Sequence, residues 1–250
     1  MSESLAYHDS LNPVIWNEYD RIIPEIKTAL NKIANKFIQY LDIDSNSIED
    51  IILTGSNCNY NWTEYSDIDL HIVVDMNALD CEGCMIDIDD CFRAKKSLWN
   101  DRHDITIKGH EVELYVQDAS QTEIKNSGVY SLHNEKWITK PVYDSNIQYD
   151  EVLIRNKSDM LANQIIDVLN DHSDEKLNKI KELNQKISNY RKAGLTKEGE
   201  FSLENLVFKT LRNRGLIDKL RDSESKVEDK ELSVEGSVPV FNTLQKLIIK

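Results

Sequence analysis

Two kinds of hydrophobic pattern divide this chain: strand-like and helical runs alternate up to about residue 150, and only helical runs follow. Near residues 14–40 apolar side chains recur at helical spacing, which predicts a helix that packs on a sheet. A further hairpin is expected from residues 128–132 and 136–140, before Pro141. Other apolar or alternating runs predict strands near 50–54, 67–74, 104–108 and 111–117, with a helix near 85–100. The sheet is therefore predicted to be mixed.

From about Glu151 long helical stripes replace the alternating runs. Beyond Asp222 a charged stretch with little periodicity is typical of a linker, and an apolar segment closes the chain. The pattern predicts an α+β protein with a mixed β-sheet flanked by helices in residues 1–150. A helical domain is expected in residues 151–222, and a linker and C-terminal tail in residues 223–250.

A glycine and a serine follow the first predicted strand, and two aspartates open the second. Gly55 and Ser56 can bring backbone N–H groups close to an anion such as a phosphate. Asp67 and Asp69 share one face of their strand because side chains alternate along it. Two carboxylates beside buried apolar residues repel each other unless a cation neutralises them, and such oxygen donors suit Mg²⁺ or Mn²⁺. The stretch therefore predicts a divalent metal site and a phosphate-binding turn.

The order apolar-Gly-Ser, ten residues, Asp-Ile-Asp resembles the signature of the DNA polymerase β-like nucleotidyltransferase superfamily. The surrounding sequence, from Leu11 through His71, is also similar to nucleotidyltransferases of large tailed phages. The resemblance implies that Asp67 and Asp69 bind two metal ions and that the Gly55–Ser56 turn holds the β- and γ-phosphates of a nucleoside triphosphate. It also implies a third carboxylate on a later strand and a helical domain beside the catalytic sheet.

Two glutamates are candidates for the third carboxylate. Alternating runs that meet at Gly109 predict a hairpin, and Glu111 and Glu113 share one face of its second strand. Glu113 lies mid-strand between apolar neighbours, where the third acid of the superfamily usually lies. Glu111 follows the turn and fits a solvated residue equally well. Glu113 is therefore preferred as a catalytic and metal-binding residue.

Basic residues of the helical region are candidates for holding the triphosphate: Arg191, Lys192, Lys209 and Arg212. Singly, each of them fits a solvated basic face. As a cluster beside an acidic half, phosphate contact is the better interpretation. The resemblance supports this assignment, because in the superfamily the helical region faces the catalytic strands.

Aromatic and histidine residues near the aspartates allow more than one interpretation. Tyr60, Trp62 and Tyr65 lie in the spacer, where an aromatic ring can stack on a base or pack the loop. His71 lies on the same face of the predicted strand as Asp67 and Asp69, but a packing role is favoured over a position beside the metal. His110 has no partner that the sequence identifies.

Charge and cysteine content restrict the partners and the compartment. The net charge is −14, and residues 1–150 carry 12 Lys and Arg against 27 Asp and Glu. Such an acidic half disfavours extensive nonspecific duplex binding and attracts divalent cations. No secretory signal and no membrane-length apolar run are visible, so cytoplasmic free cysteines are expected, in the host cytoplasm if the protein is phage-encoded. Cys81 and Cys84 have half of a zinc-knuckle spacing but no second pair, which disfavours zinc.

With the resemblance, these observations favour a metal-dependent nucleotidyltransferase that moves a nucleoside monophosphate from a triphosphate to an acceptor hydroxyl and releases pyrophosphate. An RNA end, a second nucleotide, a small molecule and a protein hydroxyl are all open as acceptors. One alternative is a catalytically inactive nucleotide-binding or regulatory module of the same fold. Another is a partner-binding protein that uses its acidic surface. Motifs of dinucleotide oxidoreductases, P-loop enzymes and α/β-hydrolases are absent.

Overall fold

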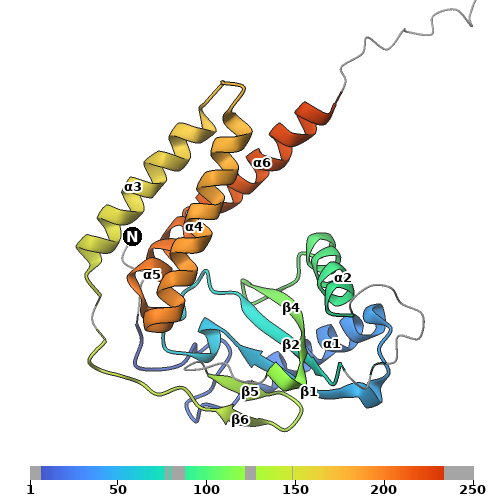
Figure 1. Ribbon diagram of the computed structural model, residues 1–250. Coiled ribbons are helices and arrows are strands. Elements are labelled where there is room, and N and C mark those ends of the chain that lie inside the picture. Colours follow the sequence, from blue (N-terminus) through green and yellow to red (C-terminus); the bar gives the residue numbers. More distant parts are fainter. Residues whose placement is uncertain (1–6, 77–78, 80–87, 122–127, 148, 234–250) are drawn as a thin grey trace, which may run out of the picture. The chain divides into compact units, whose positions relative to one another are not determined.

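The computed structural model describes residues 7–76, 79, 88–121, 128–147 and 149–233. The chain divides into two compact units, residues 1–149 and residues 150–250, and each is described by itself. All described strands belong to the first unit, while the described part of the second is helical (Figure 1). The predicted α+β class, a mixed sheet with flanking helices followed by a helical region, is confirmed.

One six-stranded sheet forms the centre of the first unit, in the order β3-β4-β2-β1-β5-β6. Its only parallel pair within the described chain is β2 with β4, and the other neighbours are antiparallel. The sheet is therefore mixed, as predicted, and the expected hairpin of β5 and β6 is present. The strands are β1 (Ile48–Thr54), β2 (Ile68–Val74), β3 (Thr106–Ile107), β4 (His110–Asp118), β5 (Val129–Ser131) and β6 (Lys136–Thr139).

Helix α1 (Pro24–Leu41) precedes β1 and begins ten residues later than the predicted helix. Proline disfavours the helical conformation for the residue before it, and Ile23 is accordingly extended. Pro24 then fits the first turn, where its missing N–H costs no hydrogen bond. Helix α2 (Ile88–Arg102) lies between β2 and the β3–β4 hairpin in the chain, as a crossover between parallel strands requires.

The main core lies on one face of the sheet, where α1 and α2 pack against the central strands. Leu30 and Phe37 of α1 are fully buried in it together with Leu70 and Leu114 of the sheet. Because side chains alternate, residues 69, 71, 113, 115 and 117 point to the other face. There the buried apolar cluster is small, namely Ile52, Val73 and Val129. One face of β2 and β4 is thus left for polar side chains.

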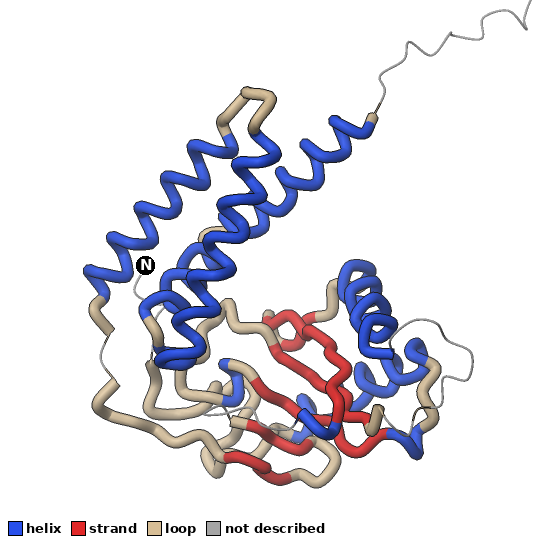
Figure 2. Tube along the Cα trace, in the orientation of Figure 1, coloured by secondary structure: helices blue, strands red, loops and turns tan. Residues whose placement is uncertain are grey.

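The second unit contains four described helices joined by short connections, with no strand in residues 150–233 (Figure 2). They are α3 (Glu151–Leu169), α4 (Lys176–Glu198), α5 (Leu203–Asn213) and α6 (Leu216–Leu232). Each helix contacts the other three. The Ser202 side chain accepts a hydrogen bond from the Asn205 backbone N–H and caps the first turn of α5.

Part of the predicted linker is helical, which corrects the sequence interpretation. Residues 223–232 continue α6, although Ile217 and Leu220 are its only buried residues in the described chain. Polar contacts with α4 hold the exposed part: Lys181 pairs with Glu228 at 2.8 Å, and Asn184 donates to Glu224. A helix held by such contacts needs no apolar stripe, so hydrophobic periodicity could not detect it.

Two further expectations concern cysteines and membranes. Cys58 is buried and Cys91 exposed, and neither forms a disulfide, whereas Cys81 and Cys84 lie outside the described residues. Among the described residues, no helix has the length and apolar character needed to cross a membrane.

Candidate active site

The sheet places two of the predicted acids side by side. Asp69 lies directly opposite Glu113 on the parallel strands β2 and β4, and opposite Thr54 on β1. Asp67 immediately precedes β2, and because side chains alternate along a strand it lies on the same face as Asp69. All three carboxylates are partly buried, so repulsion between them is less screened than at an open surface. Glu111, by contrast, is exposed and pairs with Thr106 in the hairpin.

Gly55 brings the turn that is predicted to bind phosphate next to the acids. It has φ of 77°, and a Cβ atom at this position would lie 1.8 Å from Oδ2 of Asp69. No side chain fits in that space, so the backbone of the turn approaches the Asp69 carboxylate directly. An anion bound by the turn and a cation bound by Asp69 would therefore be close neighbours.

The ten-residue spacer folds back on itself, which brings its two ends together. Ser56 Oγ donates to Ser66 Oγ at 3.0 Å, and Ser66 Oγ also accepts from the Thr63 backbone N–H at 2.9 Å. Asn57 Nδ2 donates to the carbonyl oxygens of Ser66 and Asp67 at 3.0 and 2.9 Å. These bonds fix the position of the Gly-Ser turn relative to the start of β2.

A buried polar network that the sequence did not predict lies next to this loop. Asn12 Nδ2 contacts Oδ1 of Asn57 at 2.9 Å and Nε2 of His110 at 3.1 Å. His110 Nδ1 lies 2.6 Å from the carbonyl oxygen of Ser66, which can only accept. The hydrogen bonds therefore assign one neutral tautomer to His110, with the proton on Nδ1. The only signal for this network in the sequence is a few polar residues among apolar ones.

Glu113 has a tyrosine as its partner. The Tyr115 hydroxyl donates to Oε2 of Glu113, and Nζ of Lys96 lies 3.9 Å from the centre of the Tyr115 ring. Burial is the largest cause that raises the pKa of Tyr115, and the hydrogen bond to Glu113 raises it further. The phenol consequently stays protonated and keeps donating to the carboxylate throughout the physiological range.

His71 occupies the same face, one pleat further along β2. Its Nδ1 lies 2.8 Å from Oε1 of Gln117, and its ring lies 4.7 Å from that of Tyr115. Burial lowers the pKa of His71 more than the hydrogen bond to Gln117 raises it. A neutral, hydrogen-bonded histidine agrees with the packing role that the sequence favoured.

The donor set suits a hard divalent cation, because Asp67, Asp69 and Glu113 supply carboxylate oxygens only. Among the described residues, no group of three or more His, Cys, Asp or Glu side chains is already arranged around a point where an ion would bind. Glu113 is instead hydrogen-bonded to Tyr115. The chemistry of the residues therefore fits Mg²⁺ or Mn²⁺, while their side chains are not arranged as a finished site.

The aromatic residues of the spacer divide into two groups. Tyr60 packs against Tyr7 and Tyr143, and Trp62 stacks on His8 and donates to the carbonyl oxygen of Ser10. These contacts agree with packing of the loop. Tyr65 is 52% exposed, so it is the aromatic residue of the spacer that is open to a base.

The four predicted triphosphate-binding cations all belong to the second unit. Arg191 and Lys192 lie on α4, and Lys209 and Arg212 lie on α5. Arg191 reaches α5, where its Nε donates to Oδ1 of Asn205 at 3.2 Å. Lys192 is exposed, and the two residues on α5 are half-buried. Their role in binding a triphosphate remains a prediction.

No family model and no curated protein matches this chain. One similar solved structure is the STING-associated CdnE c-di-GMP synthase from Capnocytophaga granulosa, at 14% identity and a TM-score of 0.23, with 84% of each chain covered. Another is the CdnE cyclic dinucleotide synthase from Elizabethkingia meningoseptica with GTP and Apcpp, at 13% identity and a TM-score of 0.25, with 81% of this chain and 78% of that chain covered. Neither likeness is strong enough to assign an activity, and the similarity to phage nucleotidyltransferases remains a prediction.

Proposed function

We propose that this chain is a metal-dependent nucleotidyltransferase, which transfers a nucleoside monophosphate from a nucleoside triphosphate to an acceptor hydroxyl and releases pyrophosphate. The observation that carries the proposal is the position of Asp69. It lies opposite Glu113 in the sheet, and its carboxylate fills the space above Gly55. The turn and the pair of acids thus meet at one residue, so metal ions held by the acids would lie beside the phosphates held by the turn, as transfer of a nucleoside monophosphate from a triphosphate to a hydroxyl requires.

Each residue has a role that follows from its chemistry. Backbone N–H groups at Gly55 and Ser56 hold the outer phosphates, and Asp67, Asp69 and Glu113 hold two Mg²⁺ or Mn²⁺ ions. When bound, the ions neutralise the charge of the triphosphate and lower the pKa of the acceptor hydroxyl. Tyr115 keeps one oxygen of Glu113 in place, and the other oxygen can accept the proton of the acceptor hydroxyl.

The acceptor is proposed to be small or to present only a terminus: an RNA end, a second nucleotide, a small molecule or a protein hydroxyl. Long duplexes are disfavoured because the unit that contains the site is strongly acidic. Arg191, Lys192, Lys209 and Arg212 supply few cations, enough for one triphosphate.

The test is pyrophosphate release by the purified full-length chain. Each labelled nucleoside triphosphate is incubated with Mg²⁺, with and without host RNA or lysate, and transfer of labelled monophosphate is measured in parallel. The wild type is expected to release pyrophosphate, and the Asp67→Asn/Asp69→Asn variant is expected to release none. The matched control is Asp101→Asn/Asp104→Asn, which makes the same charge change at two exposed acids and is expected to behave as wild type.

Turnover that survives in the Asp67→Asn/Asp69→Asn variant would place the chemistry elsewhere. Metal-dependent binding of a triphosphate without pyrophosphate release, whatever the acceptor, would favour the inactive nucleotide-binding module instead.

A further inference from the structure

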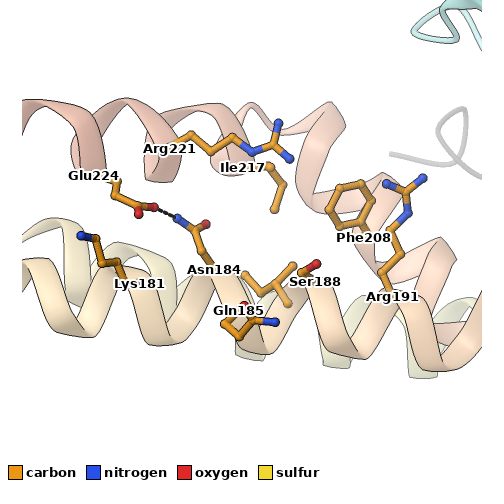
Figure 3. Close-up of a pocket in the computed structure, with 10 residues that line it drawn as sticks. Lys181, Asn184, Gln185, Ser188, Arg191, Phe208, Ile217, Arg221 and Glu224 are labelled. Atoms are coloured by element: carbon orange, nitrogen blue, oxygen red, sulfur yellow. Dashed lines mark hydrogen bonds between the residues drawn. The ribbon is translucent and has the colours of Figure 1, made fainter. Parts of the chain in front are cut away.

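The second unit contains a pocket of about 480 Å³ between α4, α5 and α6. This volume lies within the range of small-ligand pockets, about 300–1,000 Å³. Its lining combines apolar residues with amides, a hydroxyl and three cations, Lys181, Arg191 and Arg221 (Figure 3). Of the four cations predicted from the sequence to bind phosphate, only Arg191 lines it. Lys181 and Arg221 are not among the cations that the sequence predicted to bind phosphate.

One end of the pocket is closed by contacts between α4 and α6. Asn184 of α4 donates to the carboxylate of Glu224 on α6, as Figure 3 shows. Lys181 is paired with Glu228 at 2.8 Å. These contacts join the two helices, and they engage the single carboxylate of the lining and the Lys181 cation.

Arg191 is held in one orientation at the other end. Its guanidinium carbon lies 4.2 Å from the centre of the Phe208 ring, and its Nε donates to Asn205 at 3.2 Å. Phe208 is buried, with 7% of its surface exposed, so the platform beneath the guanidinium is fixed. A guanidinium that is already oriented loses little conformational entropy when it binds a planar or tetrahedral anion.

Arg221 supplies a second guanidinium from α6. It is exposed, and in Figure 3 no hydrogen bond joins it to the other residues drawn. Ile217 lies one turn before it on the same helix and is buried at the pocket. The guanidinium groups of Arg191 and Arg221 therefore lie on either side of Phe208 and Ile217 (Figure 3), and Ile187 and Ser188 of α4 also line the pocket.

We propose that this pocket binds the phosphate of a small nucleotide, with Arg191 and Arg221 as the anion-binding pair. Guanidinium groups match phosphate oxygens in geometry as well as in charge. The apolar wall of Phe208, Ile187 and Ile217 suits the body of a nucleoside, and the Gln185 and Ser188 side chains suit its polar edges. This binding needs no metal ion, and the proposal does not depend on the transfer reaction proposed for the sheet. The nucleotide can be the substrate of that reaction or a separate effector.

The first experiment measures ATP and GTP binding by calorimetry in EDTA, with full-length chain that carries Asp67→Asn and Asp69→Asn. Without the metal ion and both aspartates, the site proposed on the sheet cannot bind a triphosphate through metal ions. Arg221→Gln in this background is expected to weaken binding of at least one of the two nucleotides by about tenfold or more. The matched control is Lys219→Gln, which removes the same charge from an exposed position of α6 outside the pocket, and it is expected to change the affinity less than twofold.

Equal affinities of the Arg221→Gln and Lys219→Gln proteins would overturn the proposal, and so would the absence of ATP and GTP binding in EDTA. Arg221 and Lys219 are exposed, so both variants are expected to fold, which thermal unfolding verifies.

A second experiment tests whether the bound nucleotide is the substrate of the transfer reaction or a separate effector. It measures pyrophosphate release by the chain that carries Arg221→Gln alone. A raised KM for the triphosphate indicates the substrate, and an unchanged KM indicates an effector. Failure of pyrophosphate release would refute the proposed reaction without affecting the binding result.

Discussion

The acidic site on the sheet and the cationic pocket between the helices are built in different ways. In residues 1–149 the site residues are fixed by strand pairing, which sets Asp69 opposite Glu113, and by buried hydrogen bonds around Asn57. In residues 150–250 the pocket depends on side chains from three helices, and Arg191 and Arg221 are 30 positions apart in the chain. A site on strands has little freedom to adjust, whereas a pocket that includes the exposed Arg221 has more. Mutations should therefore act differently in the two regions.

The largest effect is expected at Gly55, where the backbone of the turn and the Asp69 carboxylate leave no room for a side chain. Gly55→Ala should lower pyrophosphate release by about a thousandfold, because the new Cβ atom would lie 1.8 Å from Asp69 Oδ2 and would displace either the turn or the acid. The matched control is Gly109→Ala. Gly109 also has a positive φ, but a Cβ atom there would have no neighbour within 4 Å. Similar losses in both variants would mean that backbone strain, and not the approach to Asp69, is responsible.

A smaller but still large effect is expected from the third acid. Glu113→Gln should lower kcat by at least about a hundredfold while triphosphate binding survives, because a metal-positioning or base role acts mainly on the transition state. Glu111→Gln makes the same change two residues away at an exposed position, and it should be close to neutral. Steady-state kinetics of both variants decide between them. The reverse pattern would assign the role to Glu111.

The smallest expected effect is a loss of stability from a change in the buried network of residues 1–149. A change in the pocket of residues 150–250 is expected to cause no such loss. Asn57→Ala should lower the free energy of unfolding by about 2 kcal/mol, because it removes the hydrogen bonds that the Asn57 side chain makes with buried partners such as Asn12 and the Ser66 carbonyl oxygen. Urea unfolding followed by tryptophan fluorescence reports on this, since all four tryptophans lie in residues 1–149. Asn46→Ala, the same change at an exposed position, and Arg221→Gln should both stay within about 0.5 kcal/mol of wild type. An Asn57→Ala protein as stable as wild type would show that the network is not needed to hold the loop.

The central strands were predicted well because their signal is local. Alternating apolar residues identified β2 and β4, and the predicted hairpin at Gly109 is present. The start of α1 was misplaced because the apolar stripe continues before Pro24, where the backbone is already extended. The helical residues 223–232 were taken for a linker because contacts with α4, and not an apolar stripe, hold them.

In the candidate site, too, residues that are close in the sequence could be predicted, and residues that meet only in the folded chain could not. Gly55, Ser56, Asp67 and Asp69 belong to one short stretch, so their spacing could be recognised from the sequence. Asn12 and His110 lie 98 positions apart and meet only in the folded chain. The same is true of Tyr115 and Lys96, which meet across the interface of β4 with α2.

The sequence by itself determined the central strands, the change from strands to helices near residue 150, and the short stretch that contains Gly55, Ser56, Asp67 and Asp69. Periodicity and short-range spacing are properties of neighbouring residues, and they are therefore visible without a fold. Only the tertiary structure decided that Asp69 fills the space above Gly55 and pairs with Glu113, that a buried network fixes the loop, and that Arg191 and Arg221 flank one pocket. These features depend on strand register and helix packing, which bring distant residues together and which no local pattern records.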